Sequence, residues 1–177
     1  MNAEELIKEC AKQQDPHFHL TDEKKKAMSE ALEMLPQGIE IVDIGHVSDY
    51  GPIFEERDMK VISYNLPDDM HFFNMPCKYI IMRHVLEHSP FPLLVLKNLY
   101  ASLEDSGMVL IILPKSSYWI DEYPYHYTVM SKKSWIHLFK SAGFEVEKVE
   151  EGTWTKRKDI VDIEFRFLLK KKLGVEE

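Results

Sequence analysis

The segment from His84 to His88 reads His-Val-Leu-Glu-His and lies between two apolar runs. These runs, Tyr79–Met82 and Met108–Leu113, have the length of buried strands. Imidazole and carboxylate groups can bind ligands and transfer protons near neutral pH. Open α/β sheets bind their ligands beyond the carboxyl ends of the parallel strands. Ionisable residues placed directly after a predicted strand therefore indicate an enzyme active site.

A His-x-x-Glu-His pattern on a helix is also the zinc signature of inverted metalloproteases. Here the segment continues an apolar strand and reaches Ser89-Pro90 at once, which leaves no room for a long metal-bearing helix. We therefore expect no bound metal. His88 is expected either to line a pocket or to pack against the next helix.

Length and composition limit the classes of protein to consider. A chain of 177 residues predicts one domain over 1–177, with an N-terminal helical segment over 1–37 and an α/β core over 38–177. The net charge of −8 argues against nucleic acid as a partner. No apolar run approaches the ~18–20 residues of a membrane span. Two distant cysteines, Cys10 and Cys77, favour a cytoplasmic location.

The elements that would position these residues alternate between strand and helix. Thr21 is expected to cap one helix, Ser89 to cap a second that begins at Pro90 with Leu93 facing inward, and Ser131 to cap a third. Gly107 is expected as a left-handed stop after the second helix, and Gly143 is expected to end the third. Predicted strands are 39–44, 60–64, 79–82, 108–113, 144–149 and 160–169. The last two have no helix between them, so we predict a three-layer αβα sandwich with a Rossmann-like, mostly parallel sheet ending in an antiparallel hairpin.

The loop from Lys115 to Tyr127 is rich in aromatic residues. Its rings would suit a planar or apolar ligand, or they would pack on one another as a lid. His126 in this loop is the best candidate for a general base.

Several segments resemble one enzyme family. Val42-Asp43-Ile44-Gly45 at a predicted strand end is similar to the glycine-rich motif of class I S-adenosylmethionine-dependent methyltransferases, although His46, Val47 and Asp49 depart from its usual residues. The stretch Tyr79–Pro90 is similar to the family's fourth strand and following Val-Leu-Glu-His segment. The stretches 104–114 and 126–146 also resemble later family segments.

The resemblance implies S-adenosylmethionine as the cofactor and assigns candidate residues to it. Asp43, Gly45 and His46 would shape the methionine end of the pocket, with Arg83 and His84 at the end of the next central strand. Asn65 or Asp68 would stand where the family places a ribose-binding acid. Only about fourteen residues separate the second predicted strand from the family's fourth, so the region between them is shortened.

In this interpretation the chain methylates a small-molecule acceptor, and His126, His84 or His88 removes the proton that the acceptor loses. Some quinone-pathway relatives hold a metal on the same Glu-His pair with an acid three residues earlier. That position is His84 here, so we expect no metal from the resemblance either. The alternative is a non-catalytic binding protein of the same fold, which Val47, Asn65 and the shortened middle favour. Neither the acceptor nor the oligomeric state follows from the sequence.

Overall fold

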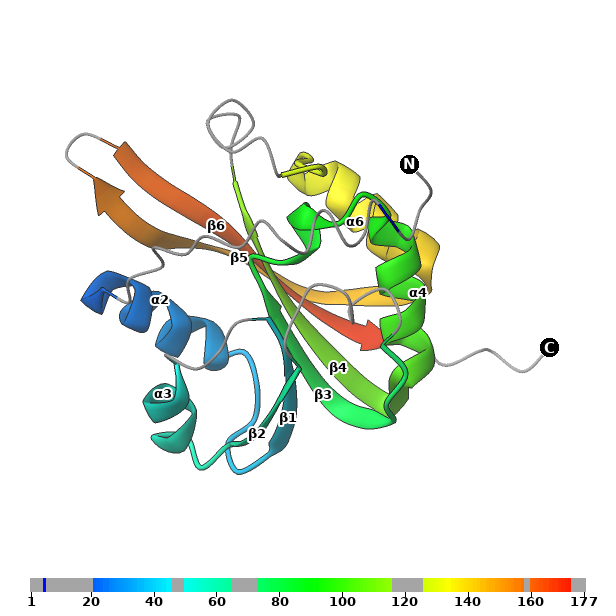
Figure 1. Cartoon of the computed structure of the whole chain (residues 1–177), viewed down its shortest axis with the longest axis horizontal. Coiled ribbons are helices and arrows are strands. Elements are labelled where there is room, and N and C mark those ends of the chain that lie inside the picture. Colours follow the sequence, from blue (N-terminus) through cyan, green and yellow to red (C-terminus); the bar gives the residue numbers. More distant parts are fainter. Residues whose placement is uncertain are drawn as a thin grey trace.

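One six-stranded sheet organises the chain, with strand order β2-β1-β3-β4-β6-β5 (Figure 1). The computed structural model describes Glu5 and residues 21–45, 50–64, 73–115, 126–157 and 160–172. β6 runs antiparallel to β4 and β5, whereas β1 to β4 pair in parallel. The strands are β1 (Glu40–Ile44), β2 (Lys60–Tyr64), β3 (Cys77–Arg83), β4 (Leu103–Pro114), β5 (Phe144–Arg157) and β6 (Ile160–Lys171).

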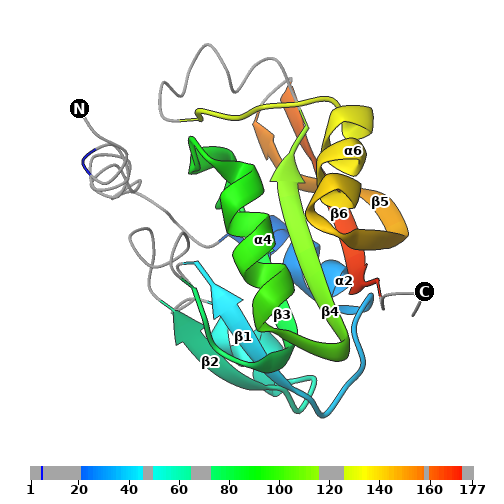
Figure 2. The same cartoon turned by 90° about the vertical axis from the view of Figure 1, so that its right-hand side faces the viewer.

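Helices cover both faces of this sheet, which confirms the predicted three-layer sandwich (Figures 1 and 2). Strand side chains alternate between the two faces, so Ile80 and Met82 pack with one set of helices and Ile81 with the other. The first face carries α4 (Pro92–Ser102) and α6 (Lys132–Ala142), together with the short 3-10 helix η1 (Leu86–His88). The second face carries α2 (Asp22–Leu32) and α3 (Gly51–Glu55).

Three of the predicted helix ends are confirmed. The Thr21 hydroxyl accepts a hydrogen bond from the Lys24 backbone N–H at 3.3 Å, and Ser131 caps α6 in the same way through Ser134 N–H at 3.2 Å. Gly143 ends α6 with φ +109°, a left-handed conformation in which a side chain would be strained.

The region around α4 corrects three predictions, which concern the start of the helix, the direction of Leu93 and the left-handed residue. α4 begins at Pro92 rather than Pro90, and Ser89 lies before the cap, where its hydroxyl accepts from Phe91 N–H at 3.0 Å. Leu93, expected to face inward, is 41% exposed, whereas Val95, Leu96 and Leu99 form the buried face of α4. Gly107 is not the left-handed residue; Ser106 takes that conformation, with φ +63°, after β4 has already begun.

The final hairpin is longer than predicted and packs against α2. One face of β6 places Phe165, Phe167 and Leu169 in the core beneath α6, as the alternation in the sequence indicates. The opposite face buries Glu164 and Arg166 on the α2 side of the sheet. Charged side chains in this position need partners, which the functional site supplies.

Some predicted elements cannot be compared with the structure. The expected helix near 3–12 and most of the aromatic loop over 115–127 lie outside the described residues, as does the segment 65–72. Among the helices that the structure describes, none is long and apolar enough to cross a membrane.

Candidate functional site

The carboxyl ends of β1, β2 and β3 meet at one edge of the sheet. The backbone N–H of Gly45 donates to the backbone carbonyl of Tyr64 at 3.2 Å. The backbone N–H of His84 donates to the backbone carbonyl of Ile112 in β4 at 2.9 Å. β1 lies between β2 and β3, so the chain reverses its direction of travel across the sheet at this point. Such a switch point is where open α/β sheets bind ligands.

Gly45 permits a close approach of two strand ends. A Cβ atom on Gly45 would lie 3.2 Å from the Val85 side chain and 3.9 Å from Arg83 O, and the residue has φ +155°. A larger residue would push the end of β1 away from the segment after β3. The glycine therefore lets the end of β1 lie close to the segment that follows β3.

Asp43 and Arg83 carry buried polar atoms without described partners. Asp43 is 3% exposed, and burial raises its pKa to about 8 although the nearby Arg83 charge opposes the shift. Among the described residues, Asp43 Oδ2 has no hydrogen-bond donor, and neither Nε nor Nη1 of Arg83 has an acceptor. Both residues lie on the α2 side of the sheet, since they alternate with core residues of the opposite face.

Arg83 is held in place by two other side chains. Its Nη2 donates to Glu164 Oε2 at 3.0 Å, and its guanidinium lies 5.2 Å from the centre of the Tyr50 ring. The side chain is only 6% exposed. An arginine fixed in this way presents its remaining N–H groups in one orientation, as recognition of a carboxylate requires.

Glu164 is the centre of a buried ionic cluster formed by Arg83, His84, Glu164 and Arg166. Its Oε2 accepts from Arg83 Nη2 and lies 3.2 Å from His84 Nε2. Its Oε1 accepts from Arg166 Nε at 2.9 Å. Burial alone raises the pKa of Glu164, but the charge of Arg83, the hydrogen bond with His84 and the charge of Arg166 outweigh it and lower the pKa to about 2. The carboxyl is therefore ionised at neutral pH.

His84 connects this cluster to the segment that follows β3. Its Nδ1 lies 3.6 Å from Glu87 Oε1, and its ring lies 4.3 Å from the Trp154 ring of β5. Burial lowers the pKa of His84, while its hydrogen bond with Glu164 opposes that shift. His84 has φ +51°, an uncommon conformation for a residue with a side chain and one found at functional sites.

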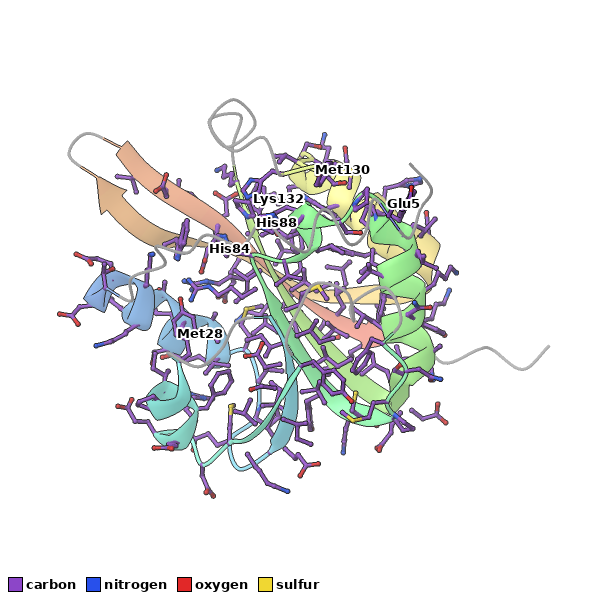
Figure 3. The ribbon with its side chains drawn as sticks, viewed as in Figure 1. Glu5, Met28, His84, His88, Met130 and Lys132 are labelled. Carbon is purple, nitrogen blue, oxygen red and sulfur yellow. The ribbon has the colours of Figure 1, made fainter. Side chains whose placement is uncertain are left out.

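Glu87, His88 and His126 lie together beyond His84 (Figure 3 labels His84 and His88). The His88 and His126 rings are 4.6 Å apart and nearly perpendicular. Thr128 fixes the segment that carries His126, because its backbone N–H donates to Glu87 O at 3.0 Å and its hydroxyl donates to Ser89 O at 2.9 Å. A contact between residues far apart in sequence thus completes this part of the site.

Burial governs the protonation of these groups. It raises the pKa of the Glu87 carboxyl to about 8, although the backbone amides of Glu87 and Val85 partly oppose the shift. It lowers the pKa of His126 to about 3, with the charges of His88 and His84 adding to the effect. His126 is therefore a neutral imidazole at pH 7, able to accept a proton but only weakly basic.

The structure unites some of the predicted site residues and leaves others open. Asp43, Gly45, Arg83 and His84 meet at the switch point, and His88 and His126 pair beside it. His46, Asn65 and Asp68 lie outside the described residues, so their roles stay predictions.

The sequence analysis does not predict Glu164 or Trp154 as residues of the site. A clue exists, because acidic and basic residues alternate with phenylalanines in β6. In a sheet covered on both faces, those charges must be buried and paired.

Comparison with known proteins agrees with this arrangement. Residues 8–149 match the protein family described as "Methyltransferase domain". No curated protein matches the sequence of this chain.

Solved structures of low identity share the fold. A SAM-dependent methyltransferase from Archaeoglobus fulgidus is 11% identical with a TM-score of 0.61, over 83% of this chain and 94% of that chain. Phosphoethanolamine N-methyltransferase 2 from Haemonchus contortus, solved with S-adenosyl-L-methionine, is 13% identical with a TM-score of 0.63, over 82% of this chain and 52% of that chain. The [4+2]-cyclase SpnF is 11% identical with a TM-score of 0.61, over 92% of this chain and 86% of that chain.

These likenesses by themselves show the fold alone, and one of them belongs to a cyclase. The sequence match carries the assignment to a family, because it spans most of the chain. The predicted resemblance is thereby confirmed: this chain belongs to the methyltransferase domain family, within the class I Rossmann-like fold.

Proposed function

We propose that this chain binds S-adenosylmethionine and transfers its methyl group to a small-molecule acceptor. The observation that carries the proposal is the pair of buried, unsatisfied groups at the switch point, Asp43 Oδ2 and the Nε and Nη1 groups of Arg83. Buried polar atoms without partners are costly, and they are characteristic of sites completed by a ligand.

The methionine end of the cofactor fits these groups chemically. It carries an α-carboxylate, which can accept from the arginine N–H groups, and an α-ammonium, which can donate to a carboxyl oxygen of Asp43 and whose positive charge would favour the ionised form of that carboxyl. When bound, S-adenosylmethionine supplies a methyl group on a sulfonium sulfur that is already activated for transfer. The protein then mainly has to orient the partners and exclude water.

The acceptor loses a proton if it reacts through oxygen or nitrogen, and the histidines near the site are the candidate bases. His126 is neutral at pH 7 and can accept a proton, as can His84, whose pKa is also lowered. His88 lies against His126. We expect replacement of the true base to lower turnover more than cofactor affinity. Unchanged turnover in all three single variants would show that none of them is the base.

Binding of S-adenosylhomocysteine tests the proposal without knowledge of the acceptor. A ligand at a hundred times its dissociation constant stabilises a protein by about 2.7 kcal/mol, which a thermal unfolding scan detects. Loss of one hydrogen bond to a charged group weakens binding by about 10- to 100-fold. We expect that loss in Asp43→Asn and in Arg83→Lys, the latter keeping a positive partner for Glu164.

Glu40→Gln is the matched control, because Glu40 lies on the same strand as Asp43 but is exposed and pairs only with Lys60 among the described residues. This variant should bind S-adenosylhomocysteine as tightly as the wild type. Equal affinities in all four proteins would remove Asp43 and Arg83 from the cofactor site.

A binding protein without catalysis is the second candidate, and one observation favours it. The guanidinium of Arg83 is already held by Glu164 and lies over Tyr50, so the protein's own side chains take up part of this edge. No stabilisation by millimolar S-adenosylhomocysteine would favour this second function. We also propose a cytoplasmic location, which the free, buried thiol of Cys77 supports.

A further inference from the structure

Three potential metal ligands gather beside the proposed cofactor edge. One donor atom each from Glu87, His88 and His126 lies within 4.8 Å of the other two. Glu87 and His88 come from η1, whereas His126 comes from the segment that leads to α6. The backbone of that segment is tied to η1 through Thr128, so the arrangement does not depend on the side chains alone.

The Glu87 carboxyl provides an independent indication that a cation belongs here. The residue is 0% exposed, and no described group donates a hydrogen bond of good geometry to either oxygen; the nearby backbone N–H groups of Glu87 and Val85 offset only part of the effect of burial. His84 Nδ1 lies 3.6 Å from Glu87 Oε1, which is beyond hydrogen-bond distance. Burial of an unpartnered carboxyl is expensive, and coordination of a cation would remove that cost.

The sequence patterns alone predict no metal, but they do not include His126, which the fold brings to the other two residues. We propose that Glu87, His88 and His126 bind a divalent transition-metal ion. Two imidazoles and one carboxylate are the ligands of zinc, iron(II) and manganese sites, whereas magnesium and calcium prefer oxygen ligands alone. Ligands about 2.0–2.2 Å from a tetrahedral ion lie about 3.4 Å apart, so the three side chains need to close by roughly 1 Å. Three protein ligands leave a position open for a further donor.

His84 links this site to the buried ionic cluster. One of its nitrogens lies beside Glu87 and the other beside Glu164, so the imidazole can orient the Glu87 carboxylate from behind. The open position of the ion would then face the reacting groups and bind an acceptor through oxygen or nitrogen. That consequence rests on the proposed methyltransferase function, whereas the metal site itself does not.

The test uses the full chain, freed of metal by a chelator and then titrated with zinc chloride or cobalt(II) chloride. Calorimetry gives the number of zinc ions bound per chain, and the visible spectrum of cobalt(II) reports whether nitrogen and oxygen ligands replace water. We expect one ion per chain, a changed cobalt spectrum and a higher unfolding temperature with zinc.

Variants locate the site. Glu87→Gln and His126→Asn should each weaken zinc binding by at least about 10-fold, the smallest loss expected for a direct ligand. His137→Asn is the control, because His137 is an exposed histidine on α6 and should leave affinity unchanged. Glu87→Gln removes the cost of a buried carboxyl, so the metal-free variant should be no less stable than the metal-free wild type. Unaltered zinc affinity in Glu87→Gln and His126→Asn, or an equal loss in His137→Asn, would overturn the proposal.

The outcome is separable from that of the proposed function. S-adenosylhomocysteine binding is measured on the metal-free protein, where the ionic cluster alone is needed. Zinc binding without S-adenosylhomocysteine binding would support the metal site and reject the methyltransferase function. The opposite result would reject the metal site and leave the function standing.

Discussion

Replacement of Glu164 by glutamine removes the negative charge that Arg83, His84 and Arg166 share. The side chain is 0% exposed and accepts from both arginines at 3.0 and 2.9 Å. Glutamine has nearly the same shape but no charge, so the buried Arg83 guanidinium loses its described ionic partner, whereas Arg166 keeps Glu30 at 3.3 Å. Loss of one member of a buried ion pair costs about 3–5 kcal/mol, because it leaves the other charge uncompensated.

The pKa of Glu164 leads to a similar magnitude. The carboxyl has a pKa of about 2 in the folded chain against 4.5 ordinarily. At 1.36 kcal/mol for each pKa unit, that difference corresponds to about 3 kcal/mol of stability. Because the folded pKa is the lower one, this stability is present above pH 4.5 and is lost as the pH falls toward 2.

Urea denaturation followed by circular dichroism measures the effect. Glu164→Gln should lower the free energy of unfolding at pH 7 by about 3 kcal/mol, and its difference from the wild type should shrink as the pH falls below 4.5. Glu151→Gln is the matched control, since Glu151 also pairs with two cations, Lys115 and Lys132, but on the surface. Exposed pairs contribute about 0–1 kcal/mol. Equal effects of the two substitutions at pH 7 would refute the reasoning.

Two further substitutions test the strand edge and a helix end. Asp43→Asn should raise the free energy of unfolding at pH 7 by roughly 2–4 kcal/mol, because the raised pKa of Asp43 makes the folded chain hold a proton that the unfolded chain releases. That gain should shrink as the pH falls and vanish only below about pH 3, where both states are largely protonated, and a gain independent of pH would contradict the assignment. Gly143→Ala should cost about 1–3 kcal/mol by thermal unfolding, because φ is +109° and the new Cβ would lie 2.9 Å from the Tyr100 ring. Gly51→Ala, with nothing within 4 Å of its Cβ, should be close to neutral, and equal losses in both would contradict the strain argument.

Much of the fold follows from local patterns. Apolar runs such as 79–82 and 108–113 predict β3 and β4. Each run is too short for a typical helix and has the length of a strand that is buried on both faces of a sheet. Thr21 and Ser131 predict helix starts, because each hydroxyl can accept a hydrogen bond from a backbone N–H three residues later. The position of His84 and Glu87 after a strand predicts a ligand site, since every parallel strand of such a sheet ends at the same edge.

The details that local patterns miss lie near α4. Ser89-Pro90 carries the signature of a helix start, yet the helix begins two residues later. The hydroxyl of Ser89 bonds to Phe91 N–H and its carbonyl accepts from Thr128, so a tertiary contact competes with the local signal.

The sequence by itself determines which segments become strands and helices and which residues stand at their ends, because those features depend on neighbours a few positions away. Only the tertiary structure decides what those residues meet. β6 inserts between β4 and β5, and this strand order brings Glu164 to Arg83 and His84. Likewise, the hydrogen bond from the Thr128 backbone N–H to Glu87 O holds the segment at 126–128 beside η1, where His126 lies close to Glu87 and His88. Both contacts depend on how the whole chain packs its apolar faces, and no short stretch of sequence contains that information.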